Sequence, residues 1–171
     1  MGKFSGLITV EFHPPKKYVM KKDLSYDCGE LTKNDREALE GVGVNLTTND
    51  VGMEDSELTV RTGFVTDLAS VPRLLWRVLA PWDVARAAII HDLLYLTIRQ
   101  YRHRMKQEIG DGVTLGEDKA LIKRAKKASD KVFLCAMNDA EPPVPSWKRY
   151  AAYYAVAAFG RWSIIPNESN I

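Results

Sequence analysis

Residues 84–98, with the sequence VARAAIIHDLLYLTI, decide the fold class of the second half of the chain. Their apolar side chains recur at the period of an α-helix, which predicts a helix that begins at Pro81–Asp83, with Asp83 as N-cap, and runs to about Arg102. One face of this helix is apolar apart from one imidazole, and it carries Val84, Ala87, Ala88, His91, Leu94, Tyr95 and Ile98. His91 therefore lies in the middle of a face that we expect to be buried.

Three more helices are predicted around this one. A basic connection that contains glycine covers residues 102–116, and three prolines within residues 139–146 separate the last two helices. Serine is a good N-cap, so Ser70 and Ser146 are each expected to begin a helix. The expected helices are Pro72–Leu79 after Ser70, Glu117–Asn138, and Trp147–Trp162 after Ser146.

The first third of the chain has the residue pattern of β-strands. One strand is expected at Leu7–Phe12, and a second at Tyr18–Met20 leads into another around Leu24–Tyr26. A further strand is expected at Leu58–Val65, where apolar and polar residues alternate. The segment before it is rich in turn-forming residues and is expected to be loop, apart from one or two helical turns within Asn34–Leu39.

These elements predict an α+β fold, in which a small N-terminal antiparallel β-sheet is followed by a three- to four-helix unit. The length of 171 residues is that of one ordinary domain, so residues 1–171 are expected to form a single domain. Within it, residues 1–66 are expected to be mainly β and residues 70–163 mainly α. The connections are expected at residues 102–116 and 139–146.

Composition excludes several classes of protein. With 46% hydrophobic and 27% charged residues, the chain is not disordered, collagen-like or a disulfide scaffold. The 24 Lys and Arg residues against 22 Asp and Glu residues leave a formal charge of +2, so nucleic acid is not expected as the main partner. Cys28 and Cys135 lack CxxC spacing and are expected to be free thiols. We recognise no signal peptide and no transmembrane segment, and we expect synthesis in the cytoplasm.

Two ionisable residues on apolar helix faces are the first candidate functional residues. The imidazole of His91 needs a partner, and Tyr95, one turn later, is placed to offer a hydroxyl to the same partner. Asp130 lies where its helix is apolar nearly all round, so its carboxylate needs a partner too. We predict either a dyad in which Asp130 orients His91, or a buried salt bridge from Asp130 to a lysine or arginine such as Arg86. A core histidine without a catalytic role is the alternative for His91.

Two further carboxylates suggest a cation site. Asp92 projects from the helix about 100° away from His91. Asp67 and Ser70 belong to the stretch GFVTDLASVP, residues 63–72, which connects the last strand to the first predicted helix. Together with backbone carbonyls of this loop, Asp67 and Asp92 are the residue types that hold a hard cation. A purely local capping arrangement of Asp67 and Ser70 is the alternative.

Basic and aromatic residues raise the question of a surface partner. Basic residues cluster within residues 99–106 and again within 119–127. Such clusters usually form solvated helix faces, and an anionic membrane surface or a phosphate-bearing partner is the alternative. The four tryptophans, Trp76, Trp82, Trp147 and Trp162, are expected in the core, with an interfacial position as the alternative.

Four stretches that occur in order make the chain resemble a known family. They are GFVTDLASVPRLLW at residues 63–76, ARAAIIHDLLY at 85–95, ASDKVF at 128–133 and YAAYYAVAAFG at 150–160. Together they resemble a phage and prophage family, domain-of-unknown-function family 1353. The resemblance covers residues 58–160, with a basic insertion or divergent linker at residues 102–123, and it implies a phage origin.

A second, more distant resemblance bears on chemistry. The pattern HDxxY at residues 91–95, followed on a later helix by Asp-x-x-Phe at residues 130–133, is similar to the active-site helices of the phospholipase A2 superfamily. The resemblance implies that His91 is the general base that activates water, that Asp92 ligates Ca²⁺, and that Asp130 orients the histidine with help from Tyr95. The cysteine framework and the glycine-rich calcium loop of that superfamily are absent here.

Two functions of different classes fit these residues. The first is a calcium-assisted lipid ester hydrolase, whose partner is a lipid or membrane surface. The second is a non-enzymatic virion or tail accessory protein, made in the host cytoplasm and incorporated with other virion proteins, in which the pair of His91 and Asp130 is a buried structural network. An HD-type metallophosphohydrolase or a zinc peptidase would need further histidine ligands, and only His13 and His103 remain.

Overall fold

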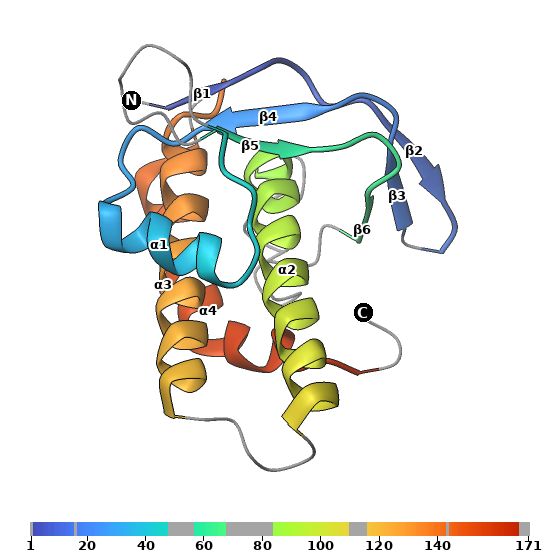
Figure 1. The fold of residues 1–171 in the computed structure, drawn as a ribbon. Helices are drawn as coiled ribbons and strands as arrows, with labels where there is room; N and C mark the ends of the chain where they lie inside the picture. The colour runs from blue at the N-terminus through green and yellow to red at the C-terminus, as the bar shows by residue number, and fades with distance from the viewer. Residues whose placement is uncertain are drawn as a thin grey trace.

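The computed structural model of the chain has an α+β fold, as the sequence predicts. It describes residues 2–15, 17–47, 57–67, 84–109, 116–142 and 144–167. In these ranges the strands of two small antiparallel sheets come first, interrupted by one short helix, and three longer helices follow. Figure 1 shows the strands lying across one end of the long helices α2 (Ala85–Ile109) and α3 (Gly116–Asn138), while α1 (Lys33–Gly41) lies along their side.

The strands form two three-stranded sheets rather than the single sheet expected. Both sheets are antiparallel, and a short strand that the sequence did not predict, β1, stands at the edge of the first. One sheet has the order β1-β4-β5, with β1 at Lys3–Phe4, β4 at Leu24–Asp27 and β5 at Glu57–Val60. The other has the order β2-β3-β6, with β2 at Val10–His13, β3 at Lys17–Met20 and β6 at Val65–Thr66.

The predicted strand Leu58–Val65 is wrong as a single element, because the chain turns between β5 and β6. Gly63 has a φ of 88°, a left-handed conformation that favours glycine. The carboxylate of Asp23 fixes this turn by accepting hydrogen bonds from the Thr62 amide at 2.7 Å and from the Arg61 guanidinium at 2.9 Å. The turn carries the chain from the first sheet to the second, which brings Thr66 to the site described below.

The helices α1 at Lys33–Gly41, α2 at Ala85–Ile109, α3 at Gly116–Asn138 and α4 at Ser146–Ser163 form the second layer. α3 is central, because it packs against α1, α2 and α4. α1 is longer than the one or two turns expected. A capping box explains its start, since Thr32 accepts from the Asp35 amide while the Asp35 carboxylate accepts from the Thr32 amide.

Two predicted helix boundaries are corrected. α2 continues past Arg102 to Ile109, so the connection is shorter than expected. Just before this extension, the Tyr101 hydroxyl donates to Asp118 at 2.8 Å and links α2 to the start of α3. The N-cap of α4 is Pro145, without a side-chain cap, and not Ser146. The predicted helix Pro72–Leu79 and the caps Ser70 and Asp83 lie outside the described residues.

A continuous core joins the sheets to the helices. Tyr26 of β4 is wholly buried, and its hydroxyl donates to Asp139, beyond α3, at 2.8 Å. Cys28 and Cys135 are both buried free thiols, as predicted. None of the helices in the described ranges is long and apolar enough to cross a membrane.

Candidate functional site

His91 and Asp130 face each other between α2 and α3. His91 Nε2 lies 3.2 Å from Asp130 Oδ1, and the side chains of His91 and Asp130 are 0% and 5% exposed. The structure thus brings the predicted partner His91 to Asp130. The imidazole packs against two aromatic rings, those of Tyr95 and Phe133, with centroid distances of 4.0 Å and 4.8 Å. These contacts restrict the orientation of the imidazole ring.

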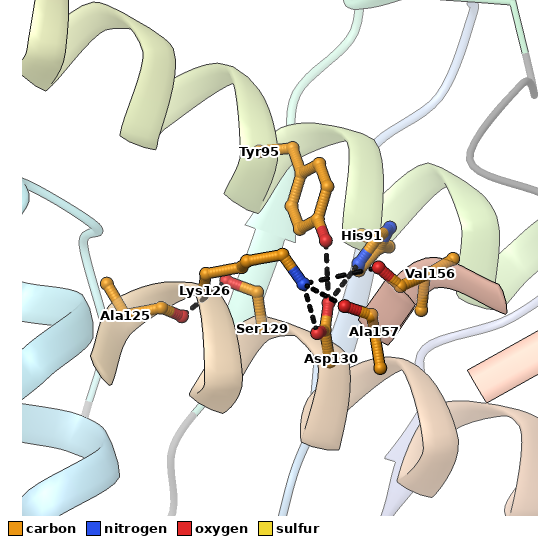
Figure 2. Close-up of polar contacts among 8 residues, drawn as sticks. All are labelled: His91, Tyr95, Ala125, Lys126, Ser129, Asp130, Val156 and Ala157. Atoms are coloured by element: carbon orange, nitrogen blue, oxygen red, sulfur yellow. Dashed lines mark hydrogen bonds and ion pairs between the residues drawn. The ribbon is translucent and has the colours of Figure 1, made fainter. Parts of the chain in front are cut away.

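Tyr95 completes the predicted trio. It lies one turn after His91 on α2, and its hydroxyl donates to Asp130 Oδ1 at 2.7 Å. The same carboxylate oxygen is thus shared by the imidazole and the phenol (Figure 2). Burial, together with the negative charge of Asp130, raises the pKa of Tyr95, so the phenol keeps its proton and stays a donor.

Lys126 is the residue that sequence reasoning missed. Its Nζ donates to Asp130 Oδ2 at 2.7 Å, and to the carbonyl oxygens of Val156 and Ala157 on α4 at 3.2 Å and 3.3 Å. Figure 2 shows the ammonium group between the carboxylate and α4. The signal in the sequence was the i,i+4 spacing of Lys126 and Asp130, which lay hidden in a basic run that we interpreted as a solvated face.

These contacts keep the Asp130 carboxylate ionised. Burial on its own raises the pKa of this carboxyl, but hydrogen bonds from His91, Lys126 and Tyr95 outweigh that effect. The pKa of Asp130 therefore lies below its ordinary value. An ionised carboxylate can only accept hydrogen bonds, so it selects the imidazole tautomer with the proton on Nε2.

The second ring nitrogen of His91 has a different environment. Nδ1 is buried, and no residue in the described part of the chain hydrogen-bonds to it. Figure 2 shows this nitrogen turned away from Asp130. Because Nε2 carries the proton, Nδ1 presents a free lone pair when the ring is neutral. Such a lone pair can accept a proton from water or from a ligand hydroxyl.

Asp92 and Asp67, the predicted cation ligands, both lie within electrostatic reach of Arg99 on α2. Thr66 donates a hydrogen bond to Asp92 Oδ2. Burial lowers the pKa of Arg99, and the charges of Asp92 and Asp67 oppose that shift. Among the residues whose structure is described, no group of three or more His, Cys, Asp or Glu side chains is arranged to hold a metal ion. Arg99 already supplies a positive charge to this acidic pair.

Arg86 is not the partner of Asp130, although the salt bridge of the second alternative is present and is made by a lysine, Lys126. The Arg86 guanidinium donates to the Glu141 carbonyl and lies 5.0 Å from the centre of the Phe4 ring. Lys126 supplies the positive charge that we had considered from Arg86. Ser70, the other loop residue singled out, lies outside the described residues.

A cavity of about 460 Å³ opens between the N-terminal segment, the start of α2 and the segment after α3. Its apolar lining includes Leu7, Ile8, Val84, Ala87, Ala140 and Val144, and Arg86 and Glu141 add polar groups. Ala87 lies one helical turn before His91 on the same face of α2. The volume falls within the range of small-molecule pockets, roughly 300–1,000 Å³.

Comparison with known proteins gives one match. Residues 46–156 match the family described as "Protein of unknown function (DUF1353)". No curated protein and no solved structure matches the chain. The matched range contains His91, Tyr95, Lys126 and Asp130, and it ends at Val156, whose carbonyl accepts from Lys126. Because the match spans more than half of its residues, the chain belongs to the DUF1353 family.

Proposed function

We propose that this protein is a hydrolase of carboxylic esters, with His91 as general base. One observation carries the proposal: Nε2 of His91 is held by Asp130, while the buried Nδ1 has no hydrogen-bond partner among the described residues. A buried, unpaired ring nitrogen is unfavourable for folding, and a base that must receive a proton has to be left unpaired. The arrangement therefore suits a catalytic role better than a purely structural one.

Each residue of the site has a role in this mechanism. His91 Nδ1 takes a proton from water, and the hydroxide forms a bond to the ester carbonyl carbon. Asp130 stabilises the imidazolium that results, while Tyr95 and Lys126 hold the carboxylate in place. The tetrahedral intermediate then breaks its bond to the alkoxide, which takes the proton back from Nδ1. The products are a carboxylic acid and an alcohol.

The cavity beside Ala87 supports an ester with an apolar acyl part as the substrate. Its lining is mainly aliphatic, and it lies one helical turn from His91 on α2. The resemblance to phospholipase A2 helices points to the same class, lipid esters. Calcium assistance stays a prediction, and no step of the mechanism depends on it. Arg99 lies within electrostatic reach of Asp67 and Asp92, and its positive charge opposes the binding of a cation there.

The test is acid release from a short-chain phospholipid below its micelle concentration, so that no lipid surface is needed. We expect the parent protein to release fatty acid, and His91→Gln to lose at least about a hundredfold in rate. His13→Gln is the matched control, since His13 lies half exposed on β2. Circular dichroism shows whether each variant is folded. A folded parent that releases no acid, or a folded His91→Gln at full rate, contradicts the proposal.

A structural role in a phage particle is the second candidate, and the complete burial of His91 favours it. In this case the protein is a virion or tail accessory subunit, and the network around Asp130 stabilises the fold. Asp130→Ala is then expected to lower the free energy of unfolding by about 3–5 kcal/mol. Mass spectrometry of purified virions should find the chain in a fixed stoichiometry. Its absence from virions would exclude this role.

A further inference from the structure

The outer face of α4 carries most of the large apolar side chains that the described residues expose. Six of the nine exposed large hydrophobic residues lie within residues 147–165, namely Trp147, Tyr150, Tyr154, Phe159, Trp162 and Ile165. The tryptophan prediction is therefore corrected: Trp147 and Trp162 are 58% and 53% exposed and lie outside the core. Trp76 and Trp82 lie outside the described residues.

Helical spacing and ring stacking relate these residues to one another. Trp147, Tyr150 and Tyr154 are three and four residues apart, so they lie on one face of α4, and Ile165 follows just after the helix ends at Ser163. Tyr150 and Tyr154 stack with their ring centres 6.4 Å apart. Phe159 and Trp162 stack at 6.1 Å. We call these six side chains, five of them on α4 and Ile165 just beyond its end, the aromatic face of α4.

The charges of α4 are all positive. The helix holds Lys148, Arg149 and Arg161 and contains no aspartate or glutamate. Lys148 Nζ lies 5.8 Å from the centre of the Trp147 ring, and the Arg161 guanidinium lies 4.2 Å from the centre of the Trp162 ring. Cations therefore accompany the aromatic face at both of its ends.

The opposite face of α4 is fixed to the body of the protein. Ala152, Val156 and Gly160 are buried, and α4 packs on α3. Lys126 of α3 binds the carbonyls of Val156 and Ala157. The inner side of α4 is thus packed against the body of the protein, and the aromatic face of the same helix is exposed.

We propose that the aromatic face of α4 docks onto an anionic lipid surface. Trp and Tyr side chains have an apolar body and a polar edge, which suits the level of the lipid headgroups. Lys148, Arg149 and Arg161 attract anionic lipids, and no carboxylate on the helix repels them. Both the apolar side chains and the positive charges of α4 therefore favour an anionic lipid surface as the binding partner.

Charge argues against the main alternative, a second copy of this chain. In a symmetric dimer the same patch meets itself, so the three cations of one α4 would face the three cations of the other with no acidic residue between them on either helix. An anionic surface has the complementary sign. The proposal does not rest on the hydrolase function, because binding is measured without turnover.

Docking of α4 would also place the site close to the lipid. Lys126 connects Asp130 directly to the α4 backbone, and Gly160 of α4 lies against the Tyr95 ring. If the hydrolase proposal is correct, the same helix brings the enzyme to its lipid substrate. If that proposal fails, surface binding still stands as a measurable property of α4.

The experiment is cosedimentation of the full chain with vesicles of phosphatidylglycerol in phosphatidylcholine, and with vesicles of phosphatidylcholine alone. We expect binding to the first and much weaker binding to the second, with loss of binding as salt is raised. Trp147→Ser combined with Tyr154→Ser should weaken binding at least about tenfold, since two apolar anchors are removed. Phe12→Ser is the matched control, because Phe12 is 52% exposed on β2, and its binding should equal that of the parent.

A second pair of variants tests the charge. Lys148→Gln with Arg161→Gln should weaken binding to the anionic vesicles, whereas Lys123→Gln with Lys127→Gln on the exposed side of α3 should change it less. The proposal is overturned if the folded parent does not bind anionic vesicles, or binds phosphatidylcholine equally well. It is also overturned if the Trp147/Tyr154 variant binds as the parent does. A parent dimer in gel filtration that this variant dissociates, without vesicle binding, would assign the face to a second copy.

Discussion

Gly160 of α4 lies directly against the phenol ring of Tyr95 of α2. A Cβ atom at residue 160 would come within 3.0 Å of two ring carbons of Tyr95, Cε2 and Cζ, and would clash with its hydroxyl. That hydroxyl donates to Asp130, so the absence of a side chain at residue 160 lets α4 close over the site. The position of one glycine thus links the surface helix to the candidate dyad.

Gly160→Ala is the first prediction. Because the added methyl group must displace either Tyr95 or α4, we expect the free energy of unfolding to fall by about 1–3 kcal/mol in urea titrations. Gly116→Ala is the matched control, since nothing lies within 4 Å of a Cβ there, and it should be neutral or slightly stabilising. If Gly160→Ala is as stable as the parent, then α4 can move away from Tyr95 of α2 without a loss in the free energy of unfolding.

Lys126→Met is the second prediction. The change removes the charge from a side chain that is 13% exposed, and it leaves one oxygen of the Asp130 carboxylate and two α4 carbonyls without their donor. We expect a loss of about 1–3 kcal/mol in the free energy of unfolding. Lys127→Met, at the next, exposed position of α3, should stay within about 0.5 kcal/mol of the parent.

A double-mutant cycle makes the prediction for Lys126 sharper. If Lys126 stabilises the fold mainly through Asp130, then Lys126→Met should cost much less in an Asp130→Asn background than in the parent, because the carboxylate is already absent. Additive effects of the two substitutions would assign the contribution of Lys126 to the carbonyls of Val156 and Ala157 instead.

The sequence predicted the dyad because both partners break an apolar helix face. His91 and Asp130 were each ionisable groups in stripes that had to be buried, so each needed a partner. The role of Lys126 could not be found in the same way. Its i,i+4 partner on α3 was visible, but the α4 carbonyls that complete its contacts are brought to it by tertiary packing.

The features of the fold that depend on residues close together in the sequence could be predicted. The α+β order follows from residue periodicity, and the capping box at Thr32 was there to be recognised. The division of the predicted strand at Leu58–Val65 depends on Asp23, which is distant in sequence and binds the turn. The exposure of Trp147 and Trp162 also depends on which side of α4 meets α3, and composition does not determine that side.

A third prediction concerns pH. The pKa of Asp130 in the folded protein lies below its unfolded value of about 4. Its ionised form therefore stabilises the fold above about pH 4, and this contribution is lost as the pH falls through the folded-state pKa. Asp130→Asn should be less stable than the parent by about 2–4 kcal/mol at neutral pH, and the difference should shrink in acid.

The measurement for Asp130 is urea unfolding of parent and variant at a series of pH values from neutral to acidic. Glu117→Gln, at the exposed start of the same helix, is the control and should stay within about 0.5 kcal/mol of the parent at neutral pH. A difference between parent and Asp130→Asn that is constant with pH would mean that the ionised carboxylate is not what stabilises the folded state.

The last prediction tests whether Arg99 opposes a cation at Asp67 and Asp92. Both carboxylates act on the pKa of Arg99, so its guanidinium lies within their electrostatic reach. Removing that positive charge should leave the acidic pair more attractive to Ca²⁺. Calorimetric titration of Arg99→Gln with calcium chloride should give an affinity at least about tenfold higher than that of the parent.

Arg102→Gln on the same helix is the control and should bind Ca²⁺ as the parent does, because burial lowers the pKa of Arg102 without an opposing effect from any carboxylate in the described ranges. Equal affinities of Arg99→Gln and the parent would show that Arg99 does not compete with the cation. The absence of binding heat in all three proteins would exclude a calcium site at this pair.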